Sequence, residues 1–315
     1  MGMPLQHALI CIVGPTASGK TALAQALAER LDSAVLSADS MQVYTGMDIG
    51  TGKIKLEDRT VPYYGLDLVK PDEAYSVSLF QNYARTLIDE RDRRGEQIVM
   101  CGGTGFYIRA VIDDFAFPAG EQVGNEIRDF YTQKLEQEGS FAVWEALNEL
   151  DPASAAVIPP RDSKRVIRAL EMLDEGISYA EQKEQFSHIE PYYPSVQIGL
   201  QVEPEVLAER INARVDTMME EGLLDEVKGL LASGYRDAIT SQQAIGYKEF
   251  VAYLDGQSSL DEAIDAVKLA TRRYAKRQRT WFRKDTRIHW LEATDFNLET
   301  LTTFALDVIS KGTDE

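Results

Sequence analysis

The sequence predicts an α/β fold, in which a parallel sheet carries helices on both faces and a helical domain is inserted into the core. Short apolar runs alternate with helical stretches in the N-terminal part of the chain, and a glycine-rich loop follows the first of these runs. Beyond about residue 118 the strands give way to polar helical stretches interrupted by prolines. A chain of 315 residues can bury one large core together with a smaller domain.

The N-terminal elements follow one another as strand and helix. Leu9–Val13 is a short apolar run typical of a buried strand, and Lys20–Leu31 has the apolar spacing of a helix. Ala34–Ser37 predicts a second strand, Leu79–Arg94 a second helix, and Gln97–Cys101 a third strand. Because right-handed crossovers between such units make a parallel sheet, its ligand site is expected where the three strands end.

Polar helical stretches dominate residues 118–194, without convincing strands between them. We therefore expect a core made of residues 1–117 and 195–315, with residues 118–194 as a helical insertion. The expected helices of the insertion are Gln122–Gln137, Phe141–Glu149 and Ser163–Leu173. The elements expected after it are a strand at Ser195–Val202, helices at Glu205–Met219 and Asp261–Phe282, and a strand at Arg287–Leu291.

Composition argues against a membrane protein. No stretch approaches the roughly 20 consecutive apolar residues that a membrane-spanning helix requires, and the N-terminus lacks the pattern of a signal peptide. The two cysteines, Cys11 and Cys101, lie within apolar runs and are expected to be buried thiols in a reducing compartment. We expect a cytoplasmic monomer with no membrane contact.

Charge is distributed unevenly along the chain. The net charge is −18, yet the segment Lys268–Arg287 contains nine basic residues and one acidic residue, a local charge of +8. A smaller basic cluster comprises Arg161, Lys164, Arg165 and Arg168. Such patches can hold phosphates while the acidic remainder repels a polyanion from other surfaces. On composition alone, a basic segment of this kind is more often a solvated helix face.

Residues 14–21 read GPTASGKT and match the phosphate-loop pattern GxxxxGK[ST], between a predicted strand and a predicted helix. Backbone N–H groups of such a loop and the helix dipole bind a di- or triphosphate. Lys20 would neutralise phosphate oxygens, and the Thr21 hydroxyl would bind Mg²⁺. The core is therefore expected to be P-loop NTPase-like, and the loop to be of the nucleotide- and ATP-binding type. Its residues are Gly14, Pro15, Thr16, Ala17, Ser18, Gly19, Lys20 and Thr21.

Five further stretches are more specific than the loop. They are DSMQVY at 39–44, GGTGFY at 102–107, DSKRVIRALE at 162–171, QAIGYKE at 243–249 and RYAKRQRTWFR at 273–283. With the phosphate loop, they resemble the signature segments of the tRNA dimethylallyltransferases, also called tRNA isopentenyltransferases or the IPP transferase family, with Phe106 in place of a leucine. The resemblance covers nearly the whole chain. Two cysteines cannot form the zinc finger of many eukaryotic relatives, so the resemblance is to the bacterial type.

The resemblance implies transfer of a dimethylallyl group from dimethylallyl pyrophosphate to N6 of the adenosine 3′-adjacent to the anticodon of a tRNA, with release of pyrophosphate. An exocyclic adenine amine is a poor nucleophile, so a general base must accept its proton, and Asp39 is the candidate. Lys20, Mg²⁺ at Thr21 and Arg214 would stabilise the leaving pyrophosphate. Thr104 resembles the family residue near the reacting base and the pyrophosphate.

The target adenine must leave its stack in the anticodon loop to reach Asp39. Gln42 is the candidate for reading a base edge, and the spacing of Arg272, Lys276 and Arg279 predicts a basic stripe on one helix face. The full set of tRNA contacts that the resemblance implies is Asp39, Ser40, Met41, Gln42, Thr104, Ser163, Lys164, Arg165, Val166, Ile167, Gln242, Gln243, Arg272, Arg273, Lys276, Arg277 and Arg279.

Three other functions share part of this pattern. A P-loop kinase for a small metabolite would use the same loop, with Asp39 activating a hydroxyl, but leaves the insertion and the basic helix unexplained. A prenyltransferase acting on free adenine nucleotides has similar chemistry, and the insertion argues against it. A non-catalytic tRNA-binding module would not need Lys20 and Thr21 together with Asp39.

Overall fold

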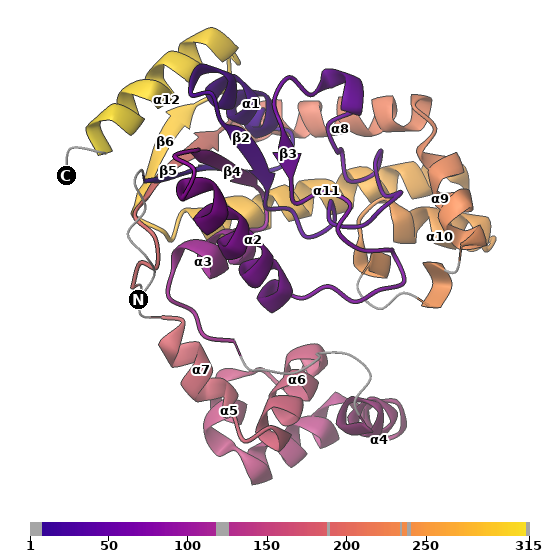
Figure 1. Ribbon diagram of the computed structural model, residues 1–315. Helices are drawn as coiled ribbons and strands as arrows, with labels where there is room; N and C mark the ends of the chain where they lie inside the picture. Colours follow the sequence, from indigo (N-terminus) through magenta and orange to yellow (C-terminus); the bar gives the residue numbers. More distant parts are fainter. Residues whose placement is uncertain (1–7, 118–125, 188–189, 234, 238–240, 313–315) are drawn as a thin grey trace. The chain divides into compact units, whose positions relative to one another are not determined.

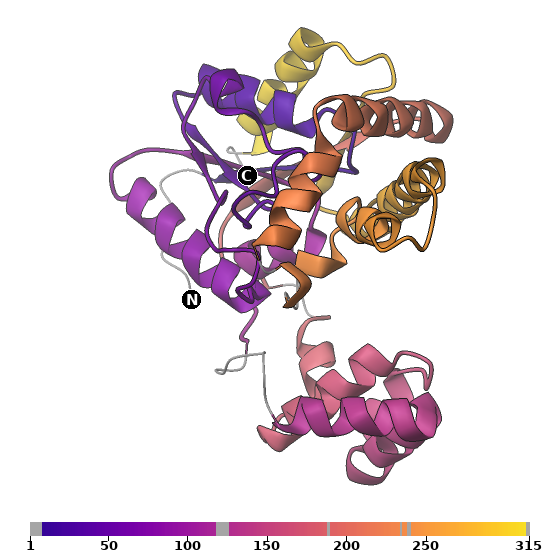
Figure 2. The same ribbon diagram turned by 90° about the vertical axis from the view of Figure 1, so that its right-hand side faces the viewer.

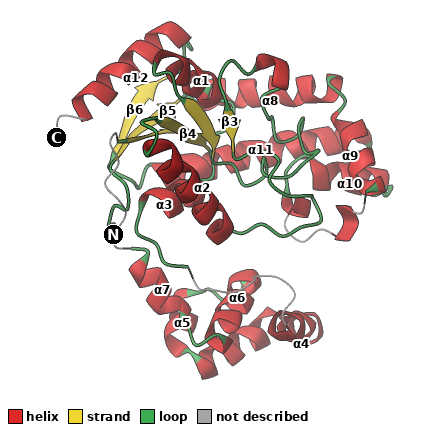
Figure 3. Cartoon of the chain, in the orientation of Figure 1, coloured by secondary structure: helices red, strands yellow, loops and turns green. Residues whose placement is uncertain are grey.

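The computed structural model describes residues 8–117, 126–187, 190–233, 235–237 and 241–312. The chain forms two compact units, one made of Met1–Asp113 with Pro191–Glu315 and the other of Asp114–Glu190. The first unit is α/β and the second is helical (Figures 1 and 3). The second unit spans most of the stretch 118–194 that was expected as an insertion, and its contact with tRNA stays a prediction.

All six strands of the sheet pair in parallel, in the order β3-β2-β4-β1-β5-β6. Their central members are apolar runs that are buried along their whole length, as strands covered on both faces must be. The predicted α/β, P-loop NTPase-like fold is therefore confirmed. The strands are β1 (Leu9–Val13), β2 (Ala34–Ser37), β3 (Tyr63–Tyr64), β4 (Ile98–Gly102), β5 (Ser195–Gln201) and β6 (Ile288–Glu292).

Each face of the sheet has its own core, because alternate residues of a strand point to opposite sides. In β1, Leu9 and Cys11 belong to one hydrophobic cluster and Ile10 and Ile12 to the other. The first cluster includes side chains from α2 (Val77–Asp92) and α3 (Gly105–Ile112), and the second includes side chains from α1 (Lys20–Arg30) and α12 (Leu298–Gly312). Figures 1 and 2 show these two pairs of helices on opposite faces of the sheet. Cys11 and Cys101 are buried free thiols, as predicted.

The helices α8 to α11, between β5 and β6 in the sequence, pack beside the sheet (Figure 1). α8 contacts α9 and α11, and α10 contacts the same two helices. The longest, α11, begins with a capping box in which Ser259 and Glu262 satisfy each other's backbone N–H groups. These helices are α8 (Pro204–Glu220), α9 (Leu223–Ala232), α10 (Tyr247–Leu254) and α11 (Leu260–Phe282), and the short 3₁₀ turns of the unit are η1 (Leu56–Asp58), η2 (Tyr235–Asp237) and η3 (Ser241–Gln243).

The second unit is a small helical domain with its own core, built on α4 (Glu126–Leu150), α5 (Pro152–Val157), α6 (Ser163–Asp174) and α7 (Tyr179–Gln185). Gly139, with a φ of 85°, is non-helical and divides α4 into two helical halves, so the expected break between two helices is confirmed. The expected start of the first helix, at residues 122–125, lies outside the described residues. Within this unit Arg128 donates to both carboxylate oxygens of the buried Glu171, at 2.6 and 2.8 Å.

The expected strands match the structure to within a residue at each end, whereas α3, α5, α7, α9, α10, α12 and β3 were not predicted. Across the described ranges of the chain, no helix has the length and apolar character needed to cross a membrane.

Candidate active site

The phosphate loop joins β1 to α1 and has a tight, partly left-handed backbone. Gly19 has a φ of 92°, and a Cβ at this position would lie 2.2 Å from the ring of Phe296, so only glycine fits there. The Lys20 ammonium donates to the Pro15 carbonyl at 3.3 Å. Burial lowers the pKa of Lys20 and outweighs the nearby Cys101 and Asp39, which raise it. A desolvated ammonium gains most from an anionic ligand.

Asp39 and Thr104 lie on the loops that follow β2 and β4, and these loops hold each other. The Thr104 hydroxyl accepts a hydrogen bond from the backbone N–H of Ser40 at 3.1 Å. Asp39 is fixed by the N–H of Met41, which donates to its carboxylate at 3.0 Å. The two strand ends approach so closely that a Cβ at Gly102 would lie 2.1 Å from the Ala38 carbonyl oxygen. The Asp39 carboxylate and the Thr104 hydroxyl are thus held by neighbouring backbone groups of one loop.

Arg214 reaches the same place from α8. Its guanidinium lies against the backbone of Gly52, where a Cβ would be 1.5 Å from Nη2. Burial lowers the pKa of Arg214, while the Asp39 carboxylate raises it. A second cation is therefore held close to Lys20 and Asp39, although these residues are far apart in sequence.

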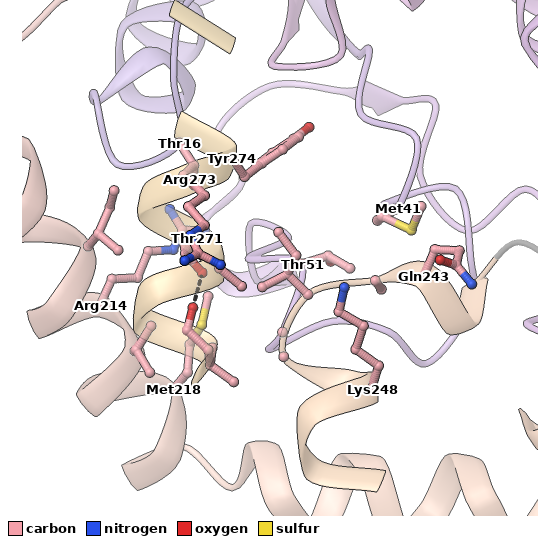
Figure 4. A pocket seen from close by; sticks show the side chains of 18 of the residues that line it. Thr16, Met41, Thr51, Arg214, Met218, Gln243, Lys248, Thr271, Arg273 and Tyr274 are labelled. Atoms are coloured by element: carbon pink, nitrogen blue, oxygen red, sulfur yellow. Dashed lines mark hydrogen bonds between the residues drawn. The ribbon is translucent and has the colours of Figure 1, made fainter. Parts of the chain in front are cut away.

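Two hollows meet at these residues. The smaller one adjoins the phosphate loop and includes Lys20 and Thr21 in its lining. The larger one, of about 490 Å³, is lined by α11 and by the turn before α10. Figure 4 shows Arg214, Arg273 and Tyr274 on one side of the larger hollow and Met41 and Gln243 on the other. The residues that line both hollows are Thr16, Asp39, Thr51 and Arg214.

The family of the chain follows from comparison with known proteins. Residues 42–285 match the family model for IPP transferase, and residues 7–60 match that for isopentenyl transferase. The chain belongs to the IPP transferase family. A tRNA dimethylallyltransferase of Carboxydothermus hydrogenoformans is 44% identical over 95% of this chain and 96% of its own.

Solved structures of IPP transferases agree with this membership. The full-length tRNA isopentenylpyrophosphate transferase of Bacillus halodurans superposes with a TM-score of 0.71 at 42% identity, covering 98% of this chain and 99% of that one. A eukaryotic dimethylallyltransferase described as acting on tRNA superposes with a TM-score of 0.80 at 28% identity, covering 97% of this chain and 80% of that one.

The basic helix α11 faces the larger hollow with residues other than the expected stripe. Arg273 and Arg277 are exposed and line the hollow. Arg272 is half-buried and donates a hydrogen bond to Asn212 of α8, and Arg279 is also half-buried. Arg272 and Arg279 are thus less exposed than expected, because the apolar face of α11 turns them toward its neighbours, and their contact with tRNA stays a prediction.

Gln42, expected to read a base edge, lines the smaller hollow, and its side-chain amide makes hydrogen bonds within the site. Its carbonyl oxygen accepts from the Ser37 hydroxyl at 2.7 Å, and its NH₂ donates to the Thr51 carbonyl at 3.2 Å. Gln42 thereby ties two loops of the site together. Gln242 likewise donates to the carbonyls of Tyr235 and Arg236, whereas Gln243 lines the larger hollow.

Two of the five residues expected to contact tRNA from the helical unit are wrong candidates. Val166 and Ile167 are 0% and 6% exposed and belong to the core of that unit. The amphipathic helix α6 turns them inward, and it leaves Lys164 and Arg165 exposed, with Ser163 half-buried at its first turn. Only these three polar residues of the stretch can meet a ligand from solution.

Sequence reasoning missed two residues that hold the site together. Gln278, buried on α11, accepts from the backbone N–H of Thr16 at 2.9 Å and donates to the Gly103 carbonyl at 2.9 Å. It thereby joins the phosphate loop to the loop after β4, and a polar residue at a core position of the helix was the available signal. Glu226 of α9 accepts from three consecutive backbone N–H groups, and no sequence pattern indicates this role.

Proposed function

We propose that this chain transfers a dimethylallyl group from dimethylallyl pyrophosphate to N6 of the adenosine 3′-adjacent to the anticodon in tRNA, releasing pyrophosphate. The observation that carries the proposal is that Asp39 and Arg214 line both hollows at once. A pyrophosphate ester on the phosphate loop and an adenine in the larger hollow would meet at these two side chains. The unpaired, buried cysteines fit a reducing cytoplasm, and we take the working form to be a monomer.

Each step of the reaction has a residue placed for it. The N6 amine attacks C1 of the donor as Asp39 accepts one of its protons, so the N6–C1 bond forms and the C1–O bond breaks. Lys20, the loop N–H groups and Arg214 stabilise the negative charge that develops on the departing pyrophosphate. Thr104 keeps Asp39 in place through its hydrogen bond to the neighbouring Ser40.

The residues also fit a magnesium ion. No group of three His, Cys, Asp or Glu side chains suited to a metal occurs among the residues that the structure describes. Mg²⁺ is commonly held by only one or two protein oxygens together with substrate phosphates and water. Thr21 and Asp39 line the smaller hollow and offer such oxygens. When bound, the ion would supply further neutralisation of the pyrophosphate.

The test is to supply prenyl-labelled dimethylallyl pyrophosphate with Mg²⁺ and either unmodified total tRNA or AMP, without ATP. We expect label in tRNA alone, with an equal amount of pyrophosphate released, because the loop holds the donor itself. A synthetic anticodon stem–loop with guanosine at the target position is the matched control and should remain unlabelled.

Other outcomes contradict the proposal in distinct ways. Label in AMP alone would indicate a prenyltransferase for free nucleotides. A strict need for ATP hydrolysis, or phosphate transfer from ATP to a small metabolite, would indicate kinase-type chemistry.

A further inference from the structure

A separate hollow of about 430 Å³ lies along α11, outside the two hollows of the active site. Its charged lining residues are all cationic, and they surround one large aromatic side chain. The lining consists of Arg273, Lys276, Arg277, Thr280, Trp281 and Lys284. Arg273 and Arg277 also line the larger hollow of the active site, so the two hollows are neighbours that share a rim of two guanidinium groups.

Trp281 is fixed in position and yet open to solvent. A Cβ at Gly105 would lie 2.1 Å from Cδ1 of Trp281, so the indole packs directly on the start of α3. The ring of Phe106 lies 6.3 Å away, edge to face. Even so, Trp281 is 41% exposed, whereas the next residue, Phe282, is buried. The indole therefore adjoins the Thr104 loop and offers part of its surface to a ligand.

Single exposed aromatic residues are common and need no function. Here three further facts point to a ligand: the ring is held by Gly105 and Phe106, four cationic side chains surround it, and the hollow adjoins the proposed adenine site. Proteins that read single-stranded RNA stack unpaired bases on aromatic side chains and hold the phosphates with basic ones.

We propose that this hollow binds a second unstacked nucleobase of the substrate RNA, that of the nucleotide adjacent to the modified adenosine. The base stacks on Trp281, and the phosphodiester between the two nucleotides lies between Arg273 and Arg277. This inference rests on the proposed function. It adds a second base site, which fixes the register of the RNA by holding the neighbour of the reacting adenosine.

The experiment is a double-mutant cycle between protein and RNA. Anticodon stem–loops with an abasic residue on the 5′ or the 3′ side of the target adenosine are compared with the intact stem–loop, by affinity for wild type and for Trp281→Leu. For one of the two positions we expect the abasic residue to weaken wild-type binding about 5- to 100-fold, the effect of losing one base–aromatic stack. With Trp281→Leu, the same abasic residue should cause no further loss. Independent, multiplicative losses at both positions would overturn the proposal.

Controls separate stacking from damage to the fold. Trp281→Phe retains an aromatic face and should recover most of the affinity, and neither variant should alter the affinity for dimethylallyl pyrophosphate. A measurement on the wild type needs no variant: 2-aminopurine at the stacked position should lose fluorescence on binding, whereas a gain at both positions would contradict stacking. The double-mutant cycle measures binding alone and does not require prenyl transfer. If the wild type failed to transfer the prenyl group, the proposed function would be overturned, whereas the binding results could still be interpreted.

Discussion

At the scale of single residues, the site holds two desolvated cations near the Asp39 carboxylate. Burial lowers the pKa of both Lys20 and Arg214; Cys101 and Asp39 oppose this effect at Lys20, and Asp39 and Glu221 oppose it at Arg214. Desolvated charges raise the free energy of the unliganded protein, and a pyrophosphate would relieve it. The two desolvated cations therefore lower the stability of the unliganded protein and raise its affinity for an anionic donor.

Asp39 is predicted to act in the chemical step. Asp39→Ala should lower the single-turnover rate of prenyl transfer about 10²- to 10⁴-fold, the usual contribution of a positioned base. Asp39→Asn keeps an oxygen for the Met41 N–H but cannot accept the proton, so it should be nearly as slow. Donor affinity, measured by titration, should change little in either variant. A wild-type rate in the asparagine variant would exclude Asp39 as the base.

The buried Lys20 ammonium is predicted to lower the stability of the folded protein. A folded-state pKa below the unfolded value of about 10.4 means that the penalty is full below the folded pKa, where Lys20 is protonated in both states, and disappears as pH rises from the folded to the unfolded value. Lys20→Met should therefore raise the melting temperature at pH 7, by about 2–4 °C per kcal/mol gained, and weaken donor binding. The exposed Lys311, paired with Asp307, provides the control: Lys311→Met should give no gain. If the gain in melting temperature of Lys20→Met persisted unchanged at pH 10.5, the lowered pKa of Lys20 would not be the source of the penalty.

At the scale of elements, α9 holds the loop that completes the site. The Glu226 carboxylate accepts from the N–H groups of Asp48, Ile49 and Gly50 at 2.8–3.2 Å, and from the Tyr247 hydroxyl at 2.6 Å. The same loop then supplies Thr51 to both hollows and the backbone that supports Arg214. A helix outside the α/β layers thus positions a residue of the proposed pyrophosphate site.

Glu226→Ala should lower the free energy of unfolding by about 1–3 kcal/mol, because it removes the shared acceptor of several donors. It should also weaken binding of dimethylallyl pyrophosphate, since the support of Arg214 loosens. Urea unfolding and donor titration measure the two effects. Asp225→Asn, on the next residue of α9 and paired only with Lys228 at the surface, should change neither quantity. If the two substitutions had equal effects, Glu226 would act only as a surface charge, and its hydrogen bonds to the loop would have no specific role.

The elements also show where sequence reasoning ends. The central strands were predicted because they are continuous apolar runs, and the phosphate loop because its pattern needs a strand before it and a helix after it. The strand β3 has two residues, which are too few to show the alternating apolar pattern of a strand. The helices α9 and α10 depend on packing against α8 and α11. Val166 and Ile167 were misassigned because a motif does not distinguish its buried residues from its exposed ones. The hydrogen bonds of the Gln42 amide with Ser37 and Thr51 were not predicted, because a motif does not show which polar groups meet in a folded loop.

At the scale of the whole molecule, the acidic chain carries a cluster of exposed positive charge along α11. The net charge is −18, while Arg273, Lys276 and Arg277 of α11, with Lys284 just after the helix, lie around the hollows. A polyanion is repelled by most of such a surface and attracted at this one place. Binding of RNA should therefore depend on where a charge lies along α11, beyond how many charges the helix carries.

This dependence is measurable with two double variants that remove equal charge. Arg273→Ala with Arg277→Ala removes the exposed pair, whereas Arg272→Ala with Arg279→Ala removes the half-buried pair, of which Arg272 bonds Asn212. Each lost phosphate contact flattens the slope of log affinity against log salt by about 0.7–0.9. We expect the first variant to flatten the slope for tRNA by about one to two units and the second by much less. Equal slopes for the two variants would mean that α11 acts through its net charge alone, and that the specific contacts to RNA lie elsewhere, with Lys164 and Arg165 of the helical unit as the next candidates.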